Sequence, residues 1–303
     1  MSLQAIAVRF YLRYWFKRRL DPNAPASVLR ANVNDLVRGM PKPPSGVTVV
    51  PTNAGGVPAE WVAAPGADAR RALLYCHGGG YASGSPATAR DLVWRLSQAA
   101  RCPVLVVDYR LAPEHPFPAA IDDVASAYRH LLSSGFAPAS IAIAGDSAGG
   151  GLALGSLVKL RDDGAPMPAA ACAFSPWTDL AITGLSVTTN RDADSMVLAE
   201  GLRSTAAWYL GGAPATSPYA SPFHADVRGL PPTLLHVGST EVLLDDSRRL
   251  AENMKSANVE VELRIWPDMP HVFQGFAMFL PEARAAIAEA GRFLETRMLP
   301  AER

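Results

Sequence analysis

Short apolar runs alternate along the chain with longer segments in which apolar positions recur every three or four residues. Eight runs are rich in β-branched or other apolar side chains, as expected for strands, and they lie at 47–50, 60–63, 72–76, 104–107, 141–144, 170–174, 233–237 and 259–265. Helical spacing occurs between several of them, at 87–100, 119–133, 149–162 and 245–256. The middle runs lack polar alternation, which is typical of parallel strands buried on both faces. The pattern therefore predicts a three-layer α/β fold with a mostly parallel sheet of eight strands.

Two parts of the chain depart from this alternation. Residues 180–218 contain no strand and one helix-like stretch, Leu198–Leu210. We expect them to form an insertion over the carboxyl ends of the strands, where the active sites of open α/β sheets gather. Residues 1–45 precede the first strand and end in the proline-rich linker Pro41–Pro44. We therefore expect an N-terminal helical cap segment at 1–45 and a main domain at 46–303 that carries a cap insertion at about 180–218.

The first 20 residues predict an amphipathic helix. One face of its helical wheel is apolar and aromatic, with Leu3, Ala7, Phe10, Tyr11, Tyr14 and Trp15. The opposite face is basic, with Arg9, Arg13 and Lys17. We expect the aromatic face to pack on the rest of the protein, with a membrane-surface helix as the alternative. No stretch of about 18 apolar residues occurs, and the arginines interrupt every window of signal-peptide length, so we expect no stable membrane insertion.

Composition narrows the classes of function. The 303 residues include 28 basic and 28 acidic side chains, and a net charge of zero argues against a nucleic-acid partner that depends on a bulk positive field. The three cysteines are far apart and form no CxxC pair, which excludes a disulfide framework and a zinc ribbon and favours a reducing, cytoplasmic compartment. The histidines show no metal-ligand spacing, and no GxGxxG pattern occurs. We expect neither a metal nor a cofactor.

A candidate nucleophile lies in Gly145-Asp146-Ser147-Ala148-Gly149, directly after the run 141–144 and before the helical segment 149–162. A serine on a sharp strand-to-helix turn needs small residues two positions away on both sides, because the flanking backbones nearly touch. Such a turn pushes the hydroxyl out of the sheet and aims the N-terminus of the helix at a developing negative charge. The sequence thus predicts Ser147 as a nucleophile, and a glycine-rich turn that serves packing is the alternative.

A candidate oxyanion hole follows the run 72–76, at His77-Gly78-Gly79-Gly80. Backbone N–H groups in a glycine run are unobstructed by side chains, and with the N–H of Ala148 they would bind the oxyanion of a tetrahedral intermediate. A phosphate cradle is the alternative, but Tyr81 and Ala82 follow where a lysine and a hydroxyl residue would be needed. We expect His77 to orient this loop rather than to titrate.

A serine nucleophile needs a base, and the base needs an orienting carboxylate. Of the six histidines, His271 alone follows the last predicted strand on a loop, which fits the chain order serine, acid, histidine. The acid is expected after the run 233–237, where Glu241 lies nearest the strand end. Asp245 and Asp246 are the competitors, although at a helix N-terminus they already have a capping role.

Together these motifs resemble the hormone-sensitive-lipase-like (family IV) esterases of the α/β-hydrolase superfamily. The similarity runs from about residue 70 to 290 and includes Asp108–Ala120, Ser217–Pro222 and Leu230–Thr233. It implies an α/β-hydrolase sandwich with a helical cap, and a serine carboxylesterase that cleaves short- to medium-chain acyl esters through an acyl-enzyme. It maps the oxyanion hole to Gly79 and Gly80, with Gly78 adjacent, plus Ala148. One departure is Glu241-Val242-Leu243, where many members have aspartate followed by Pro-Leu.

Other functions remain open on the same residues. An amidase or peptidase would use the same catalytic groups, because they specify acyl transfer and not the acyl donor. A non-catalytic ligand-binding member of the fold is disfavoured, since Ser147, Glu241 and His271 are all present. The run 259–265 alternates apolar and polar residues as an edge strand does, and the resemblance implies a homodimer through that edge.

Overall fold

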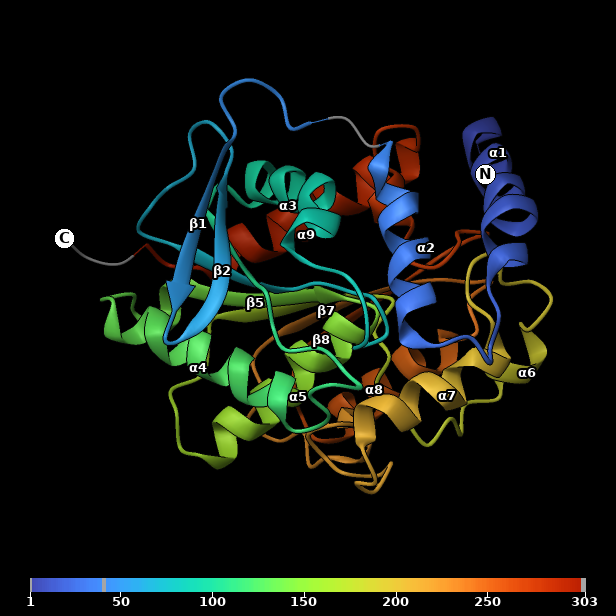
Figure 1. Cartoon of the computed structure of the whole chain (residues 1–303). Coiled ribbons are helices and arrows are strands. Elements are labelled where there is room, and N and C mark those ends of the chain that lie inside the picture. The colour runs from blue at the N-terminus through green and yellow to red at the C-terminus, as the bar shows by residue number, and fades with distance from the viewer. Residues whose placement is uncertain (1, 40–41, 301–303) are drawn as a thin grey trace.

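The computed structural model describes residues 2–39 and 42–300 (Figure 1). Within them, the predicted eight-stranded α/β sheet is confirmed, and its strand order is β1-β2-β4-β3-β5-β6-β7-β8. The strands are β1 (Thr48–Ala54), β2 (Val57–Ala63), β3 (Ala72–Cys76), β4 (Val104–Val107), β5 (Ile141–Asp146), β6 (Ala170–Phe174), β7 (Thr233–Gly238) and β8 (Val261–Trp266). Residues 40 and 41 lie outside the described residues, and the second of them is the first residue of the predicted linker Pro41–Pro44.

The strand directions explain where a site can form. β1 pairs antiparallel with β2, and β2 antiparallel with β4, while β3 to β8 run parallel. The connection from β3 leads to β4 on one side and the next connection returns to β5 on the other side of β3. Such a reversal of strand order opens a crevice at the carboxyl ends of the strands. β8 lies at the end of the sheet, as the edge-strand prediction requires, and the homodimer through it stays a prediction.

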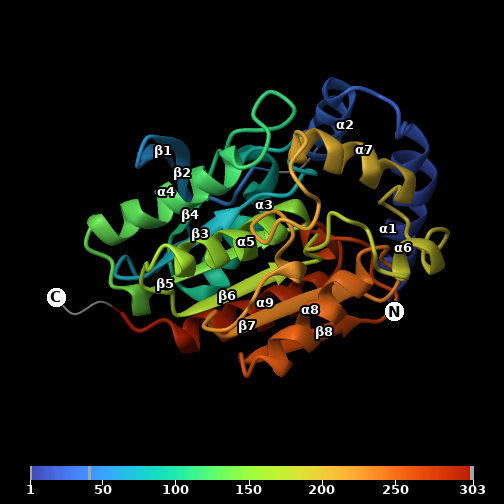
Figure 2. The ribbon, with the colours of Figure 1, turned by 90° about the horizontal axis from the view of Figure 1, so that it is seen from below.

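Helices cover both faces of the sheet (Figure 2). α3 (Pro86–Ala100) and α9 (Pro281–Arg297) pack on one face, and the other face carries α4 (Ala119–Ser133), α5 (Ala148–Asp162) and α8 (Leu244–Ser256). All residues of β3, β4, β6 and β7 are therefore buried, which is why these runs show no polar alternation. The predicted helices agree with the observed ones to within about one residue at each end, and α9 was not predicted.

The N-terminal helix packs the opposite way from the prediction. α1 (Leu3–Tyr11) continues through tighter and wider helical turns to Arg19, and its small or aliphatic residues Ala5 and Leu12 are buried. The expectation that the aromatic face packs on the protein is wrong, because Phe10 and Trp15 are about 60% exposed. The basic face packs inward instead, since the carbonyl oxygens of residues 191–194 accept hydrogen bonds from Arg13 and Lys17.

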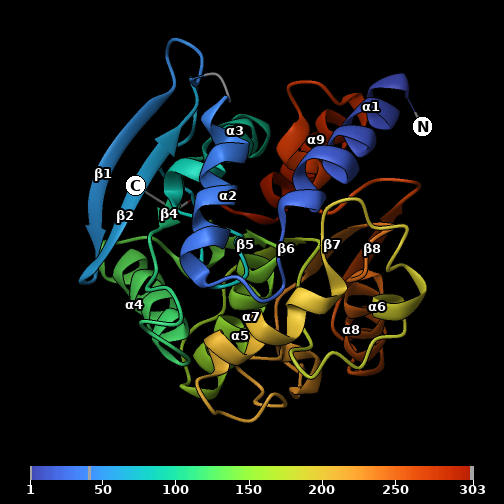
Figure 3. The ribbon, with the colours of Figure 1, turned by 45° about the vertical axis from the view of Figure 1, so that its right-hand side comes forward.

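Two separate parts of the chain lie together on one side of the molecule. α1 and α2 (Ala26–Arg38) come from the N-terminal segment, residues 1–45, and α6 (Ser186–Thr189) and α7 (Ala199–Leu210) from the insertion, residues 180–218 (Figure 3). The guanidinium of Arg30 in α2 donates to both carboxylate oxygens of Glu114 and to the carbonyls of Ala82 and Ala112, which holds α2 over the loops that follow β3 and β4. Within the described residues, no helix is both long and apolar enough to cross a membrane.

Candidate active site

Ser147 lies on the turn between β5 and α5, with a φ of 54°. The neighbouring glycines are required by close backbone contacts, one across this turn and one with the end of β3. A Cβ on Gly145 would lie 2.3 Å from the carbonyl oxygen of Gly149, and one on Gly149 would lie 2.1 Å from the carbonyl oxygen of Cys76. Any other residue at position 145 would force the turn open, and any other residue at position 149 would push the start of α5 away from the end of β3. The sharp turn that presents the Ser147 hydroxyl therefore depends on both glycines.

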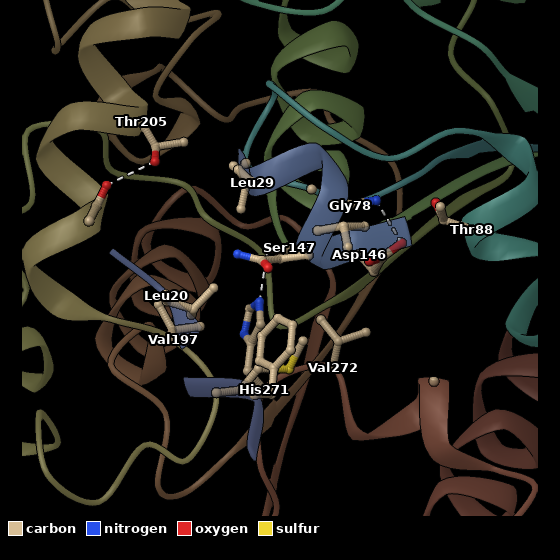
Figure 4. Close-up of a pocket in the computed structure, with 18 of the residues that line it drawn as sticks. Leu20, Leu29, Gly78, Thr88, Asp146, Ser147, Val197, Thr205, His271 and Val272 are labelled. Carbon is tan, nitrogen blue, oxygen red and sulfur yellow. Dashed lines mark hydrogen bonds between the residues drawn. The ribbon is translucent and has the colours of Figure 1, made fainter. Parts of the chain in front are cut away.

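The structure brings Ser147, His271 and Glu241 into one hydrogen-bonded row (Figure 4 shows the first two). Ser147 Oγ lies 2.8 Å from His271 Nε2, and His271 Nδ1 lies 2.7 Å from Glu241 Oε2. The three residues come from the loops that follow β5, β8 and β7, and Glu241 is fully buried. This is the geometry of a nucleophile, a general base and an orienting carboxylate.

The two competing carboxylates lie elsewhere. Asp245 accepts a hydrogen bond from the backbone N–H of Ser186, at the start of α6. Asp246 is buried and accepts from the backbone N–H groups of Thr178 and Asp179. Both side chains hold backbone segments in place, and Glu241 is the one of these three carboxylates that contacts His271.

A serine that the sequence reasoning missed holds Glu241 in place. Glu241 Oε1 accepts from the hydroxyl of Ser175 at 2.7 Å and from the N–H of Gly238 at 2.5 Å, which leaves Oε2 for His271. Ser175 Oγ in turn accepts from the N–H of Val272, next to the histidine. The available signal was its position directly after the run 170–174, which places it at the carboxyl end of β6, beside the turn that carries Ser147.

The charge of Glu241 sets the protonation of His271. Burial disfavours the imidazolium, but the adjacent carboxylate and its hydrogen bond outweigh burial, so the pKa of His271 is raised above its ordinary value. His77 behaves differently, because burial lowers its pKa to about 4. Its Nδ1–H donates to the carbonyl of Gly78, and its ring stacks on Tyr109, so it orients the glycine loop.

The glycine loop is held by a second residue that was missed, Asp146. Its carboxylate accepts from the N–H of Gly78 at 3.0 Å and from the hydroxyl of Tyr75 at 2.7 Å. A Cβ on Gly78 would lie 2.2 Å from that carboxylate, so only glycine fits. Gly78, Gly79 and Gly80 all line the same pocket as Ser147, but the N–H of Gly78 is already engaged by Asp146.

The pocket above Ser147 has a volume of about 450 Å³ and walls from several regions of the chain. The N-terminal segment contributes Phe16, Leu20, Val28 and Leu29, and the insertion contributes Met196, Val197, Leu198, Leu202 and Trp208. Val272 and Phe276, after β8, and Leu92 of α3 add to the apolar part of the wall. Polar side chains such as Asn32, Arg90 and Thr205 also line the pocket, but most of its exposed wall is apolar. A mostly apolar pocket beside one hydrogen-bonded row of polar groups suits a substrate that has a hydrophobic chain and a polar reacting group.

The insertion also contacts the loop that carries Glu241. The buried Asp194 accepts from the N–H groups of Met196 and Val197 through one oxygen, and from that of Val242 through the other. The side-chain amide of Asn190 donates to the backbone carbonyl of Glu241 at 2.8 Å. No spacing in the sequence links these residues to the acid, because about 50 positions separate them.

In the part of the chain that the structure describes, no group of three or more histidine, cysteine, aspartate or glutamate residues is arranged to hold a metal ion. The three cysteines, Cys76, Cys102 and Cys172, are buried and free.

Comparisons with known proteins show what the chain is similar to. Residues 73–275 match the family described as having the alpha/beta hydrolase fold. An acetyl-hydrolase of Streptomyces hygroscopicus is 47% identical over 254 residues, which cover 84% of this chain and 83% of that protein. A crystal structure of an esterase from the bacterial hormone-sensitive lipase family is 45% identical and superposes with a TM-score of 0.94 over 99% of both chains. A structure of EstE5 soaked with p-nitrophenyl butyrate is 44% identical, with a TM-score of 0.93 over 98% of this chain and 99% of that one.

Proposed function

Because the chain belongs to the α/β-hydrolase family, among the carboxylic ester hydrolases of the hormone-sensitive lipase type, we propose that it cleaves short- to medium-chain acyl esters through an acyl-enzyme on Ser147. The observation that carries the proposal is the unbroken row from the Ser147 hydroxyl through His271 to the buried Glu241, at one wall of an apolar pocket. We also propose that the N-terminal segment, residues 1–45, and the insertion form one cap over the catalytic domain, residues 46–303.

Acylation begins with attack of Ser147 Oγ on the ester carbonyl. His271 Nε2, at 2.8 Å, accepts the hydroxyl proton as the new C–O bond forms. The carboxylate of Glu241 then faces a positively charged imidazolium and stabilises it. The negative charge on the carbonyl oxygen is bound by the N–H groups of Gly79, Gly80 and Ala148, because Gly78 already donates to Asp146.

Deacylation repeats these steps with water as the nucleophile. Acylation must first be completed: the first tetrahedral intermediate collapses, the bond to the alcohol breaks, and His271 gives its proton to the leaving alkoxide. The neutral imidazole then removes a proton from water, and the hydroxide attacks the acyl-enzyme carbonyl. Collapse of this second intermediate returns the proton to Ser147 Oγ and releases the carboxylic acid.

The acyl preference follows from the pocket and its relatives. A volume of about 450 Å³ has to hold the acyl chain together with the alcohol, which favours chains of a few carbons over long ones. One relative is named as an acetyl-hydrolase, and the EstE5 crystal was soaked with a butyrate ester.

We therefore expect kcat/KM on p-nitrophenyl esters to peak between acetate and octanoate and to fall at least about tenfold by palmitate, because the walls limit the buried chain length. A matched p-nitroanilide series tests the amidase alternative. Hydrolysis of the anilides at rates equal to those of the esters would favour an amidase, and no hydrolysis of any ester by folded protein would contradict the proposal.

Activity should fall on the acidic side, because an imidazolium cannot accept the Ser147 proton. The pKa of His271 is raised above its ordinary value near 6.5, so the half-maximal point of kcat/KM should lie above that pH. The measurement is kcat/KM on p-nitrophenyl butyrate, followed at the isosbestic wavelength of the product. A profile that stays flat from about pH 8 to about pH 5 would exclude a histidine base.

A further inference from the structure

The N-terminal helix exposes an apolar surface that nothing in the described chain covers. We call this surface, formed by Leu3, Ile6, Phe10, Tyr11, Tyr14 and Trp15, the aromatic face; its side chains are 42–82% exposed. The opposite side is anchored by the buried Ala5 and Leu12. Single exposed apolar residues are common on proteins, but a row of them along one helix is typical of an interaction surface.

Two arginines accompany the aromatic face. The guanidinium of Arg18 lies 5.0 Å from the centre of the Tyr14 ring, and that of Arg19 lies 5.5 Å from the Trp15 ring. Residues 1–20 contain five basic side chains and no acidic one. Arg13 and Lys17 hold the helix against residues 191–194, so Arg18 and Arg19 are the cations that lie beside the exposed rings.

The combination of exposed aromatic rings and adjacent arginines favours a lipid bilayer over a second copy of the chain as the partner. Tryptophan and tyrosine prefer the headgroup level of a bilayer, and arginines beside them bind lipid phosphates while the apolar side chains enter the acyl boundary. A two-fold contact between two copies would pair the face with itself, and neither copy would supply a carboxylate from these residues to neutralise Arg18 and Arg19. The charge of the face therefore complements an anionic lipid surface and not a second copy.

We propose that the aromatic face binds the surface of an anionic phospholipid bilayer, with the helix lying in the plane of the interface. Binding of this kind is peripheral and involves no membrane-spanning segment. Phe16 and Leu20, on the same short piece of chain, line the pocket that contains Ser147. A bilayer bound to the aromatic face therefore lies next to the segment that forms one wall of the proposed acyl pocket.

Co-sedimentation of the full chain with vesicles tests the proposal and does not depend on catalysis. We expect binding to vesicles of phosphatidylglycerol and phosphatidylcholine, with much weaker binding to phosphatidylcholine alone. The double variant Phe10→Ser with Trp15→Ser should lower the partition coefficient about a hundredfold, from the loss of two inserted rings. Arg18→Gln with Arg19→Gln should lower it about 25-fold, at about fivefold for each charge.

Val50→Ser is the matched control, because Val50 is 53% exposed on β1, and Figure 1 shows β1 across the molecule from α1. It should change the partition coefficient less than about twofold. Unchanged hydrolysis of p-nitrophenyl butyrate without vesicles shows that each variant is folded. The proposal is overturned if the chain does not sediment with anionic vesicles, or if the aromatic variants bind as the parent does. It is also overturned if these residues instead mediate a dimer in size-exclusion chromatography.

Discussion

Replacing Ser147 with alanine is expected to lower kcat for p-nitrophenyl butyrate about a million-fold, which is the scale of losing the nucleophile of a serine hydrolase. Ser147 Oγ is the atom that lies 2.8 Å from His271 Nε2, and alanine removes it without enlarging the side chain. The remaining rate would come from binding and from the oxyanion donors. The measurement is single-turnover and steady-state kinetics on the same protein preparation, with the melting temperature recorded in parallel.

A double variant makes the test of Ser147 more specific, because the effects on kcat of replacing residues that act together do not add. Ser147→Ala combined with His271→Ala should be no slower than Ser147→Ala alone, because the base has no function once its proton donor is gone. Ser133→Ala, on the exposed side of α4, is the matched control and should leave kcat within about twofold. A Ser147→Ala protein that keeps a tenth of the activity would show that another group is the nucleophile.

Replacing Glu241 with glutamine should lower kcat about ten-thousand-fold, although the side chains are nearly the same size. Ser175 and Gly238 both donate to Oε1, so the amide oxygen must occupy that position and the NH₂ must face His271. An NH₂ donates to Nδ1, which forces the ring proton onto Nε2. That tautomer cannot accept the proton of Ser147, which lies on the Nε2 side. Steady-state kinetics on p-nitrophenyl butyrate at the pH optimum measure the effect.

Asp245→Asn is the matched control for Glu241→Gln. Asp245 lies on the same loop-to-helix connection but accepts from the N–H of Ser186, away from the histidine. We expect kcat of Asp245→Asn to stay within about threefold of the parent value. If the substitution has an effect, it should be on the melting temperature. The assignment of Glu241 is contradicted if Asp245→Asn abolishes turnover while Glu241→Gln is active.

The sequence predicts the sheet and brings out the three candidate catalytic residues because their signals are local. Buried parallel strands show uninterrupted apolar runs, and the glycines around Ser147 stand at a fixed local spacing, although Gly149 is required by a contact with the end of β3. Glu241 and His271 follow predicted strands, whose carboxyl ends meet at one edge of a parallel sheet. Local pattern and chain order are therefore sufficient to bring these residues together.

The residues that were missed depend on contacts between distant parts of the chain. Ser175 and Asp194 contact the Glu241 loop from 66 and 48 positions away, and no periodicity encodes such a pairing. The predicted orientation of α1 was wrong for the same reason. A helical wheel separates a basic face from an aromatic face, but which of them packs inward was decided by carbonyl oxygens at 191–194.

The contacts of Asn190 and Asp194 mean that the insertion has two structural roles that cannot be changed independently. It forms a wall of the pocket through Val197, Leu202 and Trp208, and it supports the backbone around Glu241. Grafting the insertion of another esterase onto this chain would replace the pocket wall and the support of the Glu241 loop at the same time. A chimera would then combine a changed acyl selectivity with a displaced Glu241, the residue that orients His271. Engineers who wish to change selectivity alone should vary single positions on α7 and retain residues 190–194 as part of the catalytic scaffold.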